Sequence, residues 1–512
     1  MSNKKFYLTT PIYYVNANPH IGTAYTTIVC DVLARFKRLS GYNVKFLTGT
    51  DEHGQKIDQS AQKAGKDPQE FVDEVAEKFI SIFKMMNISN DDFIRTTEER
   101  HKKAAVDFWN RLKENGHIYL DKYSGWYSVR DESFYTEEEL VKGKAPSGAE
   151  VEWIEEDSYF FDLSKWQDKL LDFYEKNPDF VYPKYRFNEI KNFVKSGLRD
   201  LSVSRVSFKW GIPVPKDDKH VIYVWLDALT NYISALGYPE NTEELKSYWP
   251  ANVHMVGKDI TKFHAIYWPA FLMAAGIELP KQIVSHGWWL NEGEKISKSL
   301  GNVIDPVDLI NDFGLDQMRY YLMREISFGN DGSFSNSSFV SRINSELSNK
   351  IGNLVQRTLS MVHKNCEEAI PSYDESDISI FYEKYEILKD ASSLFGKIEG
   401  RIDQYQFHHA LEDILLFVDQ VNVFVDQQAP WVLKKEDPKK MEEILYVVLE
   451  TVRYFSIILV PFIPDSAGKI LDNIGIPEDE REFKFLSKEF YLKGKIIEKP
   501  VGIFPRFNEE KE

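Results

Sequence analysis

Two short segments, far apart in the sequence, contain residue types suited to binding phosphate. The first, "PHIGT" at residues 19–23, places His20 and Gly22 where a strand-like run gives way to a helix-like one. A glycine there lets a phosphate or a flat base approach the backbone, and a helix N-terminus offers free N–H groups. The imidazole adds a donor whose hydrogen bond strengthens as charge develops on phosphate. Taken alone, such a short glycine motif is more often an ordinary turn.

The second segment, "KISKS" at residues 295–299, places Lys295 and Lys298 in a loop between Gly293 and Gly301. Ammonium groups on flexible side chains suit a transferring phosphoryl group or a departing pyrophosphate. Alone, a solvated charged loop is the commoner interpretation. The pairing favours phosphate chemistry, because one segment opens and the other closes an interrupted parallel sheet.

Three predicted elements position the first segment. Residues 4–15 are aromatic and β-branched and predict a buried strand, residues 24–39 have helical periodicity, and residues 43–54 predict a second strand that ends in polar residues. Strand, helix and strand at this spacing form a parallel crossover, and ligands bind beyond the carboxyl ends of such strands. We therefore expect His20 and Asp51 at that edge.

The rest of the chain predicts an α/β protein: a doubly wound parallel (Rossmann-type) sheet, split by an inserted α+β domain and followed by a C-terminal α-helical bundle. After Asp305 no further strand is expected until the extreme C-terminus. The expected domains are residues 1–115 (first half of the sheet domain), 116–218 (insert), 219–304 (second half with the KISKS loop), 305–345 (linking region) and 346–512 (helical bundle with a short tail).

Composition narrows the classes of protein. A chain of 512 residues predicts several domains, and a net charge of −17 disfavours a nonspecific nucleic-acid coat protein without excluding a local basic groove. Only two cysteines, Cys30 and Cys366, indicate a reducing compartment. Neither a signal-peptide core nor a bilayer-spanning apolar run is present in the sequence. We expect a cytoplasmic protein with no membrane partner, with a mature organellar location as the alternative.

The two phosphate segments resemble the "HIGH" and "KMSKS" motifs of class I aminoacyl-tRNA synthetases. Within that class the chain looks like the methionyl-tRNA synthetase family along nearly its whole length. The motifs that follow the family's order are "TTPIYYVNANPHIGTAYT", "FLTGTDEHGQKI", "SYFFDLS", "GLRDLSVSR", "WGIPVP", "YVWLDALTNY", "VGKDITKFHAIYWPA", "KISKSLGNVIDP" and "QQAPWVLKK". The resemblance implies a ligase that activates L-methionine with ATP to methionyl-adenylate and pyrophosphate. It then transfers methionine to the 3′-terminal adenosine of tRNA(Met).

The resemblance also implies an amino-acid site. Asp51 would hold the substrate ammonium, and Arg199 would contact the reacting carboxylate or the adenylate. The residues that would line the side-chain slot are Ile12, Tyr14, Trp225, Ala228, Leu229, Tyr232 and His264. A polarizable thioether suits such aromatic walls, and we expect the Tyr14 hydroxyl and the His264 imidazole to donate weakly to the sulfur. Without the resemblance, the aromatic side chains and His264 would be interpreted as core residues.

For ATP, the resemblance implicates residues from both phosphate segments and from "VGKD". They are His20, Gly22, Thr23, Gly257, Asp259 and Lys298, with Lys295 in support and Mg²⁺ bridging the phosphates. Thr23 stands where the family usually has a second histidine. Its hydroxyl can hydrogen-bond but carries no charge, so we expect catalysis with weaker nucleotide stabilisation. Ile296 in place of methionine conserves volume and should matter little.

The insert departs most from many relatives, which hold zinc there with paired cysteines. Here the corresponding positions are Ser128 with Asp131, and Ala145 with Gly148, so we predict no structural zinc. The insert must then be held by packing. The aromatic side chains available are Trp126, Tyr127, Phe134, Tyr135, Trp153, Tyr159, Phe160 and Phe161.

The C-terminal part carries an expected RNA-binding face. On a predicted helix at residues 350–364, basic and polar residues share one side and apolar residues another. The family pattern implicates Asn353 and Arg357 in reading the anticodon, and Trp431 in stacking on a base. On its own, Trp431 would be interpreted as a buried bundle residue. Because the chain ends soon after the bundle, a monomer is expected.

Two alternatives stay open at this point. Another apolar-specific class I synthetase, or an adenylyltransferase on the same type of sheet, would also carry "HIGT" and a lysine loop. A noncatalytic RNA-binding relative would explain Thr23, although the retained His20, Asp51, Lys295 and Lys298 favour an active enzyme.

Overall fold

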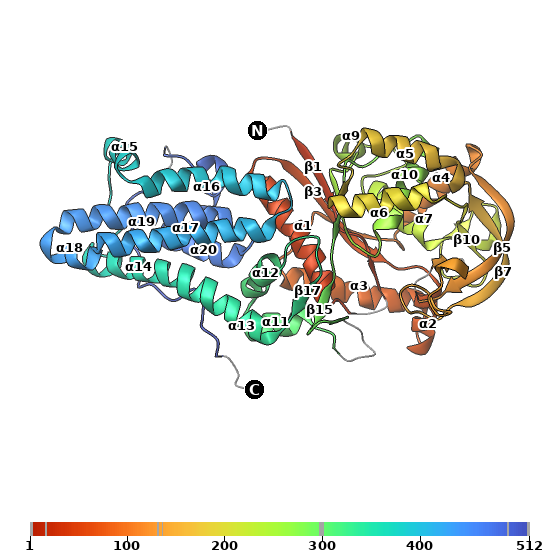
Figure 1. The fold of residues 1–512 in the computed structure, drawn as a ribbon, viewed down its shortest axis with the longest axis horizontal. Helices are drawn as coiled ribbons and strands as arrows, with labels where there is room; N and C mark the ends of the chain where they lie inside the picture. Colours follow the sequence, from red (N-terminus) through yellow and green to blue (C-terminus); the bar gives the residue numbers. More distant parts are fainter. Residues whose placement is uncertain are drawn as a thin grey trace. The chain divides into compact units, whose positions relative to one another are not determined.

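The computed structural model describes residues 4–15, 18–130, 133–135, 137–295, 302–488 and 491–508 (Figure 1). The chain divides into two compact units. The sheet unit comprises residues 5–19 and 44–286, and the bundle unit comprises residues 1–4, 20–43 and 287–512.

Seven described strands form the central sheet of the sheet unit, in the order β2–β3–β1–β13–β14–β8 with β4 beside β3. Their bounds are β1 Lys5–Thr9, β2 Tyr13–Tyr14, β3 Asn43–Asp51, β4 Asp92–Arg95, β8 Val181–Tyr182, β13 Val253–Gly257 and β14 Ile283–His286. The pairings of β13 with β1 and β14, of β14 with β8, and of β3 with β2 and β4 are parallel. The predicted parallel sheet is confirmed, and its two sequence halves meet where β1 pairs with β13.

The helices of the sheet unit are α2 Gln55–Lys63, α3 Pro68–Met85, α4 Glu99–Glu114, α5 Gln167–Lys176, α6 Lys184–Lys195, α7 Val224–Leu229, α8 Asn231–Ser234, α9 Glu243–Tyr248 and α10 Trp268–Ala275, with a π-helical turn at Phe263–Tyr267. They differ in burial: α4 buries one apolar face, whereas all four residues of α8 are buried and none of α9 is. On α4, for example, Ala104, Ala105, Phe108 and Leu112 recur at three- and four-residue spacing and join the main hydrophobic cluster. That cluster supports the residues predicted to bind methionine.

The predicted insert contains a long antiparallel ribbon of β5 Ile118–Ser128 and β7 Glu152–Phe161, flanked by β6 Ser133–Tyr135 and β9 Leu201–Ser202 (Figure 1). A smaller sheet pairs β12 Asp217–Ile222 with β10 Ser204–Arg205 and β11 Pro213–Val214. Aromatic packing occurs as predicted: Trp126 meets Trp153 edge-on at 5.4 Å between ring centroids. However, β8 lies within residues 116–218 and yet joins the central sheet through β14. This part of the expected insert is therefore continuous with the main core.

In the bundle unit, helix α1 spans Ile21–Leu39 and so begins three residues before the predicted start at Ala24. The described elements that follow are β15 Trp289–Asn291, β16 Glu294–Lys295, α11 Pro306–Phe313, α12 Leu315–Arg324 and β17 Gly332–Phe334. The expectation of no strand after Asp305 is wrong, because β17 pairs in parallel with β15. Three residues, Gly-Ser-Phe, are too short to show the alternation on which strand prediction depends.

The helical bundle predicted for the C-terminal part is present. Its helices are α13 Asn336–Arg342, a π-helical segment Ile343–Gly352, α14 Asn353–Asn365, α15 Glu375–Lys384, α16 Glu386–Ile402, α17 Phe407–Gln428, α18 Pro430–Glu436, α19 Pro438–Leu459 and α20 Pro464–Asn473. In Figure 1, α16, α17 and α19 lie side by side, and α19 is buried continuously from Ile444 to Leu459. Within the described residues, the C-terminal segment pairs with the bundle at one isolated β-bridge, Ala369 to Ile496, and not through the short strand expected there.

Candidate active site

His20 is the N-cap of α1. Its backbone is extended (φ −127°, ψ 177°), and its Nδ1 atom accepts a hydrogen bond from the Gly22 backbone N–H at 3.0 Å. A Cβ atom on residue 22 would lie 2.9 Å from Cε1 of this ring. Glycine is therefore required for the imidazole to fold over the helix N-terminus, a reason that sequence analysis missed. The helix starts early because its own motif histidine caps it.

Thr23 follows in the first turn of α1 and is 8% exposed. Its carbonyl oxygen accepts from the Thr27 hydroxyl at 2.8 Å, while its own hydroxyl makes no hydrogen bond within the described residues. This hydroxyl thus remains available to a ligand. The lysine loop cannot be placed beside it: Lys298 and Ile296 lie outside the described residues, and Lys295 is described only by its backbone pairing with Leu290.

In the sheet unit, Asp51 ends β3 as predicted and is 8% exposed. Its register partner on β2 is Tyr14, and the Val15 backbone N–H donates to the Asp51 carbonyl at 3.3 Å. The structure therefore brings the predicted ammonium partner and one predicted slot residue together, on neighbouring parallel strands at the carboxyl end of β3.

Three other predicted slot residues form an aromatic group. The Trp225 ring, on α7, meets the His264 ring edge-on at 6.4 Å between centroids, and His264 lies 5.7 Å from the ring of Tyr232 on α8. Trp225 also stacks on Phe263 at 3.7 Å, a neighbour that sequence analysis did not name. Phe263 and His264 belong to the π-helical turn, a rare geometry that occurs often at functional sites.

The hydrogen bonds of His264 indicate which of its ring nitrogens carries the proton. Its Nδ1 atom lies 2.9 Å from the Ile260 carbonyl oxygen, which can only accept, so Nδ1 carries the proton. Burial lowers the pKa of His264 to about 4, so the ring is neutral near pH 7 and Nε2 accepts from the Tyr232 hydroxyl at 2.6 Å. The prediction that this imidazole donates to the substrate sulfur is therefore wrong, because its single N–H already donates to Ile260.

The remaining slot residues lie close by in the fold. Ile12 and Tyr14 pack against the main hydrophobic cluster, which contains Leu229 and Tyr232. Ala228 is 5% exposed, and its carbonyl oxygen accepts from the Asn231 amide at 2.6 Å. All seven slot residues thus belong to one unit, on segments that share one core.

Gly257 ends β13, and Asp259 follows in the next turn. A Cβ atom on residue 257 would lie 2.7 Å from the Asp259 carboxylate, so this carboxylate covers the end of the strand. Arg199 is placed differently. Its side chain is 72% exposed, and its closest carboxylate is Glu138 at 3.8 Å. Within the described residues the structure does not bring Arg199 to the slot.

The positions that replace the family's zinc ligands carry no strong donor where they are described. Ser128 is buried at the end of β5, and the Gly148 backbone N–H donates to the Ala145 carbonyl at 2.8 Å in a tight turn. Asp131 lies outside the described residues. Across the described part of the chain, no three or more His, Cys, Asp or Glu side chains are arranged to hold a metal ion.

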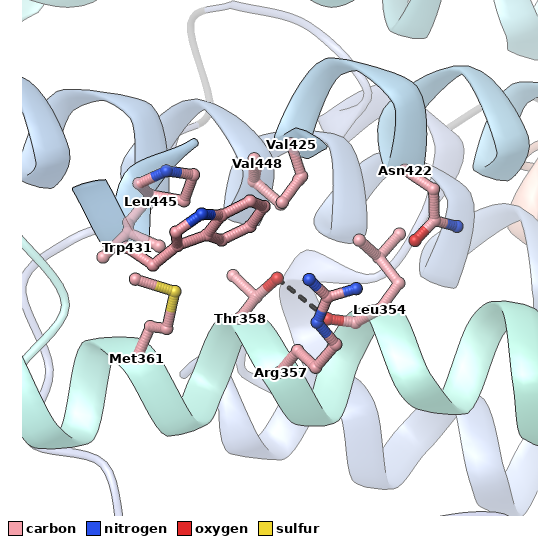
Figure 2. Close-up of a pocket in the computed structure, with 10 residues that line it drawn as sticks. Leu354, Arg357, Thr358, Met361, Asn422, Val425, Trp431, Leu445 and Val448 are labelled. Atoms are coloured by element: carbon pink, nitrogen blue, oxygen red, sulfur yellow. Dashed lines mark hydrogen bonds between the residues drawn. The ribbon is translucent and has the colours of Figure 1, made fainter. Parts of the chain in front are cut away.

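A pocket in the bundle unit joins two of the residues predicted to read RNA (Figure 2). The Arg357 guanidinium lies 5.7 Å from the ring centroid of Trp431, which is 43% exposed rather than buried. The lining residues are Leu354, Arg357, Thr358, Met361, Asn422, Val425, Pro430, Trp431, Leu445 and Val448. Asn353 is exposed one turn before Arg357 on α14 and does not line the pocket. Asn422, an amide able to read a base edge, was not predicted.

Comparison with known proteins identifies the family. A profile described as "tRNA synthetases class I (M)" matches residues 6–150 and 145–359, and one described as "Anticodon binding domain of methionyl tRNA ligase" matches residues 382–512. The chain belongs to the methionine–tRNA ligase family. Family members from Rickettsia bellii and Brucella suis are 58% and 51% identical, over 99% and 100% of this chain and 100% of each relative.

Solved structures of methionine–tRNA ligases agree. The Mycobacterium tuberculosis methionyl-tRNA synthetase in complex with methionyl-adenylate matches with a TM-score of 0.93 at 47% identity, covering 98% of this chain and all of that one. The predicted class I fold, with its C-terminal helical domain, is confirmed, as is membership of an ATP-using methionine ligase family. Among the described helices, none combines the length and apolar character needed to cross a bilayer.

One buried cluster in this methionine–tRNA ligase fold was missed by sequence analysis. Asp227, on α7, is fully buried, and its carboxylate oxygens lie 2.7 Å from Nδ1 of His53 and 2.7 Å from Nε2 of His101. Burial alone would raise the pKa of Asp227, but the two imidazoles lower it to about 2, so the carboxylate is ionised. The available signal was an aspartate inside the apolar run "VIYVWLDAL".

Proposed function

We propose that this member of the methionine–tRNA ligase family binds L-methionine with its ammonium on Asp51 and its thioether in the aromatic slot. The observation that supports this is the group formed by Trp225, Tyr232 and His264, in the same unit as Asp51. A neutral His264 suits this slot, because a polarizable sulfur packs well against uncharged aromatic rings. Tyr232 and Ile260 fix the ring, so the slot is shaped before substrate enters.

The first reaction needs no protein nucleophile. The methionine carboxylate oxygen attacks the α-phosphorus of ATP; a new O–P bond forms, the bond to the bridging oxygen breaks, and pyrophosphate leaves. The chain contributes orientation and charge stabilisation. We assign ATP to His20, Gly22, Thr23, Gly257 and Asp259, with Lys298 and Lys295 for the phosphates. Mg²⁺ would enter with ATP and would offset part of the negative charge of its phosphates.

We assign Arg199 to contact with the adenylate. Because its side chain is exposed, this contact requires that substrate binding moves the side chain inward. Its family motif, rather than its position in the structure, supports the assignment.

In the second reaction a ribose hydroxyl of the 3′-terminal adenosine of tRNA(Met) attacks the adenylate carbonyl, and AMP leaves. We propose that Arg357 and Trp431 hold an unpaired anticodon base by stacking, with Asn353 beside them. An exposed indole with a guanidinium over it suits this function, since unpaired bases are commonly stacked on aromatic rings and arginine planes.

Three further properties belong to the same proposal. The insert folds without zinc, supported by serine, alanine and glycine at three of the four ligand positions; metal analysis of the purified protein tests this. The chain acts as a monomer, which sedimentation tests. It works in the cytoplasm, which is consistent with a chain that has only two cysteines, both of them buried.

The experiment that tests the function is ATP–pyrophosphate exchange over a panel of amino acids. Methionine should support the fastest exchange, and exchange strongest with leucine or valine would contradict the proposal. Asp51→Asn should raise the KM for methionine about 10- to 100-fold, since a hydrogen bond to a charged group contributes about 1.5–3 kcal/mol. The matched control is Asp92→Asn on β4, a carboxylate paired with Arg100 instead, which should leave that KM unchanged.

A further inference from the structure

The buried Asp227 carboxylate joins three segments of the sheet unit. Its own helix, α7, carries Trp225, Ala228 and Leu229 of the proposed slot. His53 follows the end of β3, two residues after Asp51, and His101 lies on α4. His101 Nδ1 is in turn 3.0 Å from the hydroxyl of Ser234 on α8. One anion therefore connects the ammonium end of the proposed site with its side-chain end.

The turn that carries His53 is fixed on its other side as well. The Trp210 indole N–H donates to the Glu52 carbonyl at 2.6 Å, and the Gly54 backbone N–H donates to the Trp210 carbonyl at 3.1 Å. The Trp210 ring meets His53 edge-on at 5.6 Å between centroids. His53 is thus held between Trp210 and Asp227, and within the described residues its hydrogen bond to the slot helix is the one to Asp227.

A carboxylate at position 227 suits both hydrogen bonds of the cluster. Both of its oxygens face an imidazole nitrogen at 2.7 Å, so each bond needs a histidine N–H donor and an acceptor oxygen. An ionised aspartate accepts both, whereas asparagine offers one acceptor oxygen, so that one imidazole must change its tautomer to accept from the asparagine N–H. The cluster is a hydrogen-bonded clamp.

We propose that Asp227 is a positioning residue for methionine activation, which acts through His53 to hold the Asp51 end of β3 against the slot helix α7. This rests on the proposed function, because it takes Asp51 and Trp225 as the two ends of the methionine site. The proposed site contacts methionine at its ammonium group and at the far end of its unbranched side chain. The distance between Asp51 and the slot therefore selects amino acids by the length of their side chains. A misplacement of about 1 Å in such a site can cost about 100-fold in rate.

The test is ATP–pyrophosphate exchange with Asp227→Asn, His53→Asn and His53→Gln. An asparagine amide nitrogen lies near the position of histidine Nδ1, and a glutamine amide nitrogen lies near that of Nε2. His53→Asn therefore preserves a donor to Asp227, and His53→Gln does not. Asp227→Asn and His53→Gln should raise the KM for methionine about tenfold or more, with the KM for ATP within about threefold of the wild type. His53→Asn should stay within about threefold for both substrates.

The matched control is Asp162→Asn. Asp162 is also a buried aspartate of the sheet unit that pairs with a histidine, His117, at 3.1 Å, but it has no described contact with the slot helix. It should lower the melting temperature without changing the KM for methionine. Any of three results would overturn the proposal. The KM for methionine could be unchanged in Asp227→Asn, it could rise equally in Asp162→Asn, or it could be the same in the two His53 variants. If Asp227→Asn does not fold, the comparison of the methionine KM between His53→Asn and His53→Gln tests the proposal instead.

Two reference measurements separate this proposal from the proposed function. The wild type must show methionine-dependent exchange, and Asp51→Asn must raise the methionine KM. Failure of either contradicts the proposed function itself. If both hold and the Asp227 and His53 variants behave as wild type, only the positioning role is refuted.

Discussion

Replacing Asp31 with asparagine should destabilise the bundle unit strongly. Asp31 lies on α1 and Arg319 on α12, and both side chains are fully buried. The Asp31 carboxylate accepts from Arg319 Nη2 at 2.7 Å and from Arg35 Nε at 2.7 Å. Arg319 also donates to the carbonyl oxygens of Pro461 and Phe462, which follow the end of α19. One guanidinium therefore fastens the helix that His20 caps to the C-terminal bundle.

The magnitude follows from what Asp31→Asn leaves behind. The buried guanidinium keeps its neutral carbonyl acceptors but loses the buried carboxylate with which it forms an ion pair. Removing one member of a buried ion pair costs about 3–5 kcal/mol, and the retained carbonyls place this case near 3 kcal/mol. For a unit of this size the loss corresponds to a fall of about 6–12 °C in melting temperature.

The assay is urea and thermal unfolding followed by far-ultraviolet circular dichroism. The control is Asp403→Asn, which removes the partner of Lys37, also on α1, but from a pair in which Asp403 is 54% exposed. Exposed pairs contribute about 0–1 kcal/mol, so the control should remain close to the wild type. If Asp31→Asn lowers the free energy of unfolding by less than about 1 kcal/mol, the ion pair behaves like a solvent-exposed one and our inference from its burial is wrong.

Three further predictions concern single side chains. Burial lowers the pKa of His264 from 6.5 to about 4, so the unfolded chain binds the extra proton first as pH falls. A contribution of about 3 kcal/mol is therefore present above pH 6.5 and lost towards pH 4, and His264→Gln should flatten urea midpoints measured over that range. Thr23→His should lower the KM for ATP in exchange assays, and unchanged ATP kinetics would contradict our view of that position. Arg357→Gln should raise the KM for tRNA(Met) about tenfold in charging assays, far more than the KM for methionine; equal changes would count against an anticodon role.

The parallel sheet could be predicted because its signals are local. Apolar runs of strand length alternate with helical periodicity, and each run shows this without knowledge of its partner. The start of α1 could not be read in this way, since the capping residue is a histidine rather than a serine or aspartate. Strand β17 was missed because three residues show no periodicity.

The site could be predicted only in part, for a physical reason. Residue types and the family resemblance identified Trp225, Tyr232 and His264, and these side chains do meet. Which nitrogen of His264 carries the proton depends on the Ile260 carbonyl and on a tyrosine hydroxyl 32 residues away. Sequence alone does not specify such a pairing, and the expected bond to sulfur was consequently wrong.

Asp227 shows the same limit more clearly. Its carboxylate pairs with histidines 174 and 126 residues away in sequence, which come from different segments. The apolar run around it indicated burial, and a buried aspartate requires partners. The partners themselves became visible only when the three segments were placed together.

The most direct test of the central claim is a crystal structure of the chain with a non-hydrolysable analogue of methionyl-adenylate. We expect the substrate ammonium within hydrogen-bonding distance of the Asp51 carboxylate, and the thioether among the rings of Trp225, Tyr232 and His264. We also expect His264 Nδ1 still to donate to the Ile260 carbonyl oxygen. An ammonium held by another residue, or a methionine side chain outside this aromatic group, would contradict the account.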